Sequence, residues 1–164
     1  MPGRVTLVLL LIAGFAGAHA PVNQGERAGE VKRLILSNEH TSGSFPLDSR
    51  VVEKAPAILR VAVSKVANPS KLPFQIFVYL SYRSKGASQD SGPKGRILIG
   101  NFGLYPPDHP GSFSVRASEA FRALQSKNAD ASEVRLLLEM RRIHESSPWN
   151  PVEVTIEPPE WRAK

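Results

Sequence analysis

Apolar and polar residues alternate with a period of two in several short stretches of the chain, and this pattern predicts strands. In the clearest case, one face of the stretch 74–81 carries four large apolar residues, Phe74, Ile76, Val78 and Leu80. Because the opposite face carries Phe77 and Tyr79, we expect this strand to lie inside its sheet and to be covered on both sides. Further β-rich stretches occupy residues 31–36, 59–64, 96–104 and 152–157.

Two other stretches need a choice between helix and strand. Residues 118–124 have a helical composition, with Ser118 as the N-cap, and we predict one or two helical turns there. Residues 132–143 have helix propensity, but the alternation within them favours a strand. Turn-forming residues separate the predicted elements, at 68–70, 84–95, 105–111 and 146–151. Short strands with such turns between them predict an antiparallel β-sandwich with one short helix.

The first twenty residues have the three parts of a secretory signal peptide. Arg4 precedes an apolar run from Val5 to Phe15, and small residues follow. This run is too short to span a bilayer comfortably, so we do not expect a membrane anchor. Cleavage after Ala20 would place Pro21 directly behind the scissile bond, where its ring makes a poor protease substrate. The sequence therefore favours cleavage after Ala18.

The predicted cleavage gives a signal peptide at 1–18, a flexible leader at 19–30 and a single β-sandwich domain at 31–160. We expect the mature protein to be secreted or periplasmic. The chain has no cysteine, so no disulfide supports the fold and burial alone must stabilise it. A blue-copper site and a cysteine-based zinc site are excluded as well. The net charge is +6, but the basic residues are scattered without interleaved aromatics, which argues against a nucleic-acid partner.

Candidate metal ligands are few. None of the four histidines has a second one two to four positions away. His109 adjoins Asp108, whose carboxylate can orient an imidazole. Cleavage after Ala18 makes His19 the new N-terminus, where the amine and the imidazole together can chelate copper. His19, Asp108 and His109 are therefore the candidate metal residues, with copper as the candidate ion. The plainer interpretation is that His40, His109 and His144 are surface imidazoles and that the protein has no cofactor.

The sequence offers little for catalysis. It has no Gly-x-Ser-x-Gly nucleophile motif, no cysteine and no glycine-rich phosphate loop. Glu153 and Glu157 lie four apart, but their alternation with apolar residues is typical of the solvated face of a strand. We predict that the protein is not an enzyme.

The turn at 101–107 brings aromatic residues next to two prolines. A rigid aromatic that projects from such a turn can anchor a partner protein. Phe102, Leu104 and Tyr105 are therefore candidates for insertion into a partner. The alternative is that Phe102 and Leu104 belong to the core and that Tyr105 closes one end of the sandwich.

The strands, taken in order, resemble the C-terminal β-sandwich domain of plant-type polyphenol oxidases, which include catechol oxidases and tyrosinases. Gln75-Ile76-Phe77-Val78-Tyr79-Leu80 resembles the Lys-Phe-Asp-Val-Tyr-Ile strand of that family, although Phe77 stands where the family has Asp. The terminal Val-Val-Val-Thr-Leu-Val-Pro strand of the family has its counterpart at 152–158. Shorter similarities lie at 45–51, 98–102, 114–116 and 121–124.

The resemblance implies a covering domain without its enzyme. The dicopper centre of that family uses six histidines from a helical bundle, and this chain has neither. In the family, the sandwich shields the copper site with an inserted side chain, which here implies an insert from the 102–105 turn. The resemblance thus implies a non-catalytic module that binds another exported protein, such as a tyrosinase-type copper protein. The alternative function is a small secreted or periplasmic protein that binds a metal or another ligand.

Overall fold

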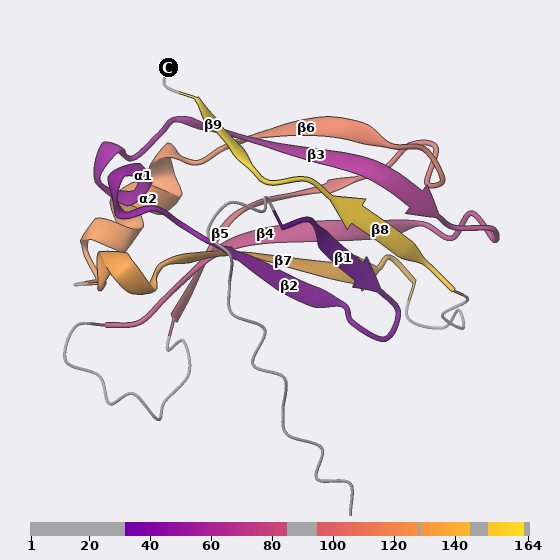
Figure 1. Ribbon diagram of the computed structural model, residues 1–164, viewed down its shortest axis with the longest axis horizontal. Helices are drawn as coiled ribbons and strands as arrows, with labels where there is room; N and C mark the ends of the chain where they lie inside the picture. The colour runs from indigo at the N-terminus through magenta and orange to yellow at the C-terminus, as the bar shows by residue number, and fades with distance from the viewer. Residues whose placement is uncertain (1–31, 85–94, 128, 145–150, 163–164) are drawn as a thin grey trace, which may run out of the picture. The chain divides into compact units, whose positions relative to one another are not determined.

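The computed structural model describes residues 32–84, 95–127, 129–144 and 151–162, and these residues form two antiparallel sheets (Figure 1). The first sheet has the order β1-β8-β3-β6, and β9 also pairs with β3. Its strands are β1 (Leu34–Ser37), β8 (Glu153–Ile156), β3 (Ile58–Ala67), β6 (Gly111–Arg116) and β9 (Glu160–Arg162). The second sheet has the order β2-β7-β4-β5, from β2 (Ser42–Pro46), β7 (Arg135–Arg142), β4 (Phe74–Tyr82) and β5 (Gly95–Gly103). The predicted all-β sandwich is confirmed.

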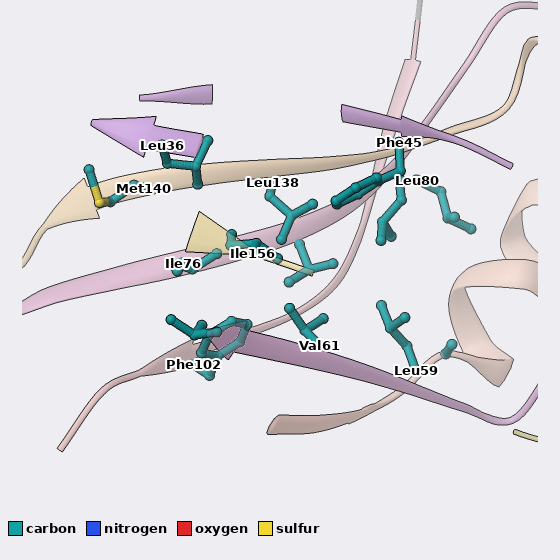
Figure 2. Close-up of a cluster of buried hydrophobic side chains, with 14 of the residues drawn as sticks. Leu36, Phe45, Leu59, Val61, Ile76, Leu80, Phe102, Leu138, Met140 and Ile156 are labelled. Atoms are coloured by element: carbon teal, nitrogen blue, oxygen red, sulfur yellow. The ribbon is translucent and has the colours of Figure 1, made fainter. Parts of the chain in front are cut away.

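The core lies between the two sheets because alternate residues of each strand point inward. Leu59 and Val61 of β3 face Ile76 and Leu80 of β4, and these side chains are almost fully buried (Figure 2). The same cluster includes residues of β1, β2, β5, β7 and β8, among them Leu36, Phe45, Phe102, Leu138, Met140 and Ile156. Without disulfides, this apolar cluster is the main source of stability.

Helices close one end of the sandwich. The predicted helix is present as α2 (Ser118–Gln125), but Ala117 and not Ser118 occupies the N-cap, and no side chain caps it. The buried face of α2 includes Phe121, whose ring meets Trp161 of β9 edge-on at 5.4 Å. The short helix α1 (Ser49–Lys54) was not predicted; the Asp48 carboxylate caps it by accepting from the Arg50 N–H at 2.8 Å. No helix among the described residues is long and apolar enough to cross a membrane.

The ambiguous stretch 132–143 is a strand, as predicted, and a single turn of 3-10 helix, η1 (Ala131–Glu133), precedes it. One expectation for β4 needs correction. β4 lies inside its sheet, between β7 and β5, but Phe77 and Tyr79 on its outer face are only half-buried. The predicted signal peptide and leader, most of the 84–95 loop and the turn at 146–150 lie outside the described residues.

Candidate functional site

The candidate site is the loop that joins β5 to β6, here called the Tyr105 loop (residues 104–110). β5 and β6 are edge strands of different sheets, so this loop crosses from one sheet to the other at one end of the sandwich. Tyr105 is followed by two prolines, and the Tyr105–Pro106 peptide bond is cis. Tyr105 is 98% exposed, more than any other large apolar residue among the described residues. A bulky aromatic with almost no contact to its own fold is suited to contact with another molecule.

Asn68 holds the Tyr105 loop in place. It directly follows β3 and is buried, with 4% of its surface exposed. Its side-chain amide donates to the carbonyl of Pro107 at 3.0 Å and to the carbonyl of Leu72 at 2.9 Å. Its side-chain oxygen accepts from the Leu72 N–H at 3.0 Å. One side chain therefore joins the β3–β4 turn to the Tyr105 loop and satisfies three backbone groups.

The structure corrects two of the three insertion candidates. Phe102 and Leu104 are 8% and 7% exposed and belong to the core. Phe102 points inward from β5 and stacks on Phe113 of β6, with ring centroids 4.2 Å apart, so it fastens the edges of the two sheets together. Their side chains cannot enter a partner without unpacking the sandwich. Tyr105 alone points away from the fold.

Asp108 and His109, two of the candidate metal residues, contact each other, and the carboxylate also pairs with a neighbouring side chain. The Asp108 carboxylate accepts from Nδ1 of His109 at 2.8 Å and lies 3.3 Å from the ammonium of Lys71. The hydrogen bond from His109, and next the one from Lys71, lower the pKa of Asp108 although partial desolvation opposes them. This arrangement gives the base of the Tyr105 loop an ion pair with the β3–β4 turn.

The same pair does not make a metal site by itself. Asp108 and His109 are adjacent residues, and the Lys71 ammonium repels a cation next to the carboxylate. Among the described residues, no group of three or more His, Cys, Asp and Glu side chains is placed to hold a metal ion. His19, the third candidate, lies outside the described part of the chain.

Sequence reasoning missed Asn68 and Lys71, which fix the loop from across a turn. The Asn-Pro-Ser triplet was recognised as a turn, and asparagine is typical there because it bonds to nearby backbone. The bond to Pro107 spans 39 positions in the sequence, so no local pattern could indicate it.

The fold and the site together define a β-sandwich that presents one exposed aromatic from a braced loop. Comparison with models of known protein families gives no match. No curated protein is significantly similar to the sequence.

Proposed function

We propose that this chain is an exported, non-catalytic module that binds another exported protein by inserting Tyr105 into a recess of that partner. The observation that carries the proposal is the 98% exposure of Tyr105 on a loop held by Asn68. Because the loop backbone is held before binding, burial of Tyr105 in a partner costs only the rotamer freedom of its side chain.

The chemistry of the loop is consistent with shielding rather than catalysis. Beside Tyr105 lies the Lys71–Asp108–His109 group, which pairs its charges internally. Together with the resemblance to the covering domain of polyphenol oxidases, this supports a tyrosinase-type dicopper protein as the partner. In that complex the copper and its ligands belong to the partner, and this chain supplies the cover.

The test uses a tyrosinase catalytic domain from which its own C-terminal domain has been removed. Purified protein is titrated onto it, and binding is followed by calorimetry and diphenol oxidation by absorbance. We expect saturable binding that inhibits oxidation, and a loss of affinity of about tenfold or more for Tyr105→Ala. Ile35→Ala is the matched control, because Ile35 is 56% exposed but lies on β1 of the other sheet.

Two results would overturn the proposal. One is the absence of binding at micromolar concentrations, and the other is an equal loss in the Tyr105 and Ile35 variants. Copper titration of the isolated protein distinguishes the proposed function from the alternative, a metal-binding protein. Tight copper binding that is lost in His109→Ala would favour a metal-binding protein.

A further inference from the structure

The outer face of the β2-β7-β4-β5 sheet carries an apolar row that is partly exposed to solvent. Tyr79 in the middle of this row pairs with Leu98 of β5 on one side and with Leu137 of β7 on the other. Leu98 is 53% exposed, and Tyr79 and Leu137 are half-buried. Phe77 extends the row by one step along β4, and its ring lies 6.4 Å from that of Tyr79. Outward-facing strand positions normally carry polar residues, so this row is unusual for a sheet face in water.

Arginines surround this apolar row. Arg141 is held over the ring of Phe77, with the guanidinium carbon 4.7 Å from the ring centroid. It also donates to Tyr79 Oη at 3.2 Å and to the Glu139 carboxylate at 3.0 Å. The hydrogen bond and the charge of Glu139 raise the pKa of Arg141 further above its ordinary value, where the guanidinium is already charged. A guanidinium fixed in one orientation is prepared to bind a carboxylate through two hydrogen bonds.

Two further arginines, Arg96 and Arg135, lie on the same outer face. Arg96 of β5 lies 3.5 Å from the Glu139 carboxylate and is 57% exposed. Arg135 of β7 donates to Ser44 Oγ at 2.8 Å. The outward-facing residues of these four strands include three arginines and one carboxylate, that of Glu139. The face therefore carries an excess of positive charge around an apolar centre, which is complementary to an acidic ligand with apolar groups.

The extent of this face, with its charges and its apolar row, selects the kind of ligand. The α-carbons of Arg135 and Arg141 lie six residues apart on β7, roughly 20 Å along the strand, and their side chains lean toward each other, onto Ser44 Oγ and Tyr79 Oη respectively. A single phosphate or carboxylate on one of these arginines leaves the apolar row uncovered, so a ligand that uses both the charges and the row is extended. A polyuronic acid would place hydroxyl groups against the apolar row, where the apolar side chains cannot pair with them. A polypeptide can supply carboxylates and apolar side chains in alternation.

We infer that this outer face, defined by Phe77, Tyr79, Leu98, Leu137 and the arginines 96, 135 and 141, binds an extended acidic polypeptide segment. Carboxylates of the segment pair with the arginines, and its apolar side chains cover Leu98 and Tyr79. The Tyr105 loop takes no part in this contact, so the two interactions are separable.

The test is a titration of the ¹⁵N-labelled protein with a synthetic decapeptide in which Glu alternates with Leu and Tyr. Amide shifts are expected on β4, β5 and β7 and not on β3 or β6. Arg141→Gln and Arg135→Gln are each expected to weaken binding about five- to tenfold. Arg60→Gln is the matched control, because Arg60 lies on β3 of the other sheet and is also ion-paired, with Glu160 at 3.5 Å.

Further arms separate this inference from general charge attraction. Leu98→Ser changes no charge and no buried group, and it is expected to weaken binding of the decapeptide about fivefold. A peptide with Ser in place of Leu and Tyr should bind at least tenfold more weakly. Equal binding of that peptide, tighter binding of polygalacturonate, or an equal loss in Arg60→Gln would overturn the inference. Tyr105→Ala should leave decapeptide binding unchanged, so failure here and failure of the proposed function are distinguishable.

Discussion

The side-chain amide of Asn68 donates to the carbonyl of Pro107 at 3.0 Å and so ties the end of β3 to the Tyr105 loop. Asn68→Ala removes this bond and leaves the partly buried carbonyls of Pro107 and Leu72 without their donor. We expect the free energy of unfolding to fall by about 1–3 kcal/mol, since an unsatisfied buried polar group costs that much. Urea denaturation followed by tryptophan fluorescence measures the change.

The control for this prediction is Asn101→Ala. Asn101 is exposed and donates only to Gln75 Oε1 at 3.3 Å, so its loss should change the free energy of unfolding by no more than about 0.5 kcal/mol. Equal effects in the two variants would show that Asn68 is not the brace of the loop. Amide hydrogen exchange at His109, whose N–H donates to the Pro106 carbonyl, should become faster in Asn68→Ala alone.

Truncation of two neighbouring residues of the Tyr105 loop should affect stability to very different extents. Leu104→Ala removes a buried core side chain and is expected to cost about 2–5 kcal/mol of unfolding free energy. Tyr105→Ala removes a side chain that is 98% exposed and should change stability by no more than about 0.5 kcal/mol. Thermal or urea unfolding of both variants checks the difference. A large loss in Tyr105→Ala would mean that Tyr105 supports the fold instead of facing a partner.

The sequence predicted those strands in which large apolar residues alternate strictly. β4 and β8 follow this pattern because one face of each packs against the core. β6 was missed because serines alternate with only two large apolar residues. The strand forms by pairing with β3, which is distant in the sequence. β9 was missed because Trp161 is its only apolar residue and the strand exists by pairing with β3. Local patterns cannot indicate such long-range pairing.

The candidate site was predictable only in part for the same reason. The prolines correctly indicated a defined loop with an aromatic residue. Which aromatic faces outward depends on the register of β5, and a β-bulge between β4 and β5 at Val78 and Tyr79 shifts that register. Beyond the bulge, Phe102 points inward and pairs with Phe113, and Tyr105 is left outside.

Gly95 at the start of β5 pairs with Tyr82, whose ring fills the space that a side chain at position 95 would need. A Cβ there would overlap the outer end of the Tyr82 ring, which belongs to the buried core. We expect Gly95→Ala to lower the unfolding free energy by about 1–3 kcal/mol through overpacking. Gly103→Ala is the matched control on the same strand, because its Cβ would meet the Phe74 carbonyl oxygen at 3.4 Å and Gln75 Cγ at 3.9 Å, which are ordinary contacts. A second substitution, Tyr82→Val, should largely relieve the Gly95→Ala penalty, and additive losses would contradict this explanation.

The ion group at the base of the Tyr105 loop should give a measurable pH dependence. The pKa of Asp108 is lowered in the folded protein, first by the hydrogen bond from His109 and then by Lys71. A lowered folded-state pKa means that the unfolded chain binds more protons near its own pKa. The contribution to stability is therefore fully present above about pH 4 and is lost as the pH falls through the lowered value. A carbon-detected NMR titration of the Asp108 carboxyl should show the pKa returning toward its ordinary value in His109→Ala, and returning less in Lys71→Met. A larger effect of Lys71→Met would mean that the ion pair, and not the hydrogen bond from His109, sets the charge of this loop.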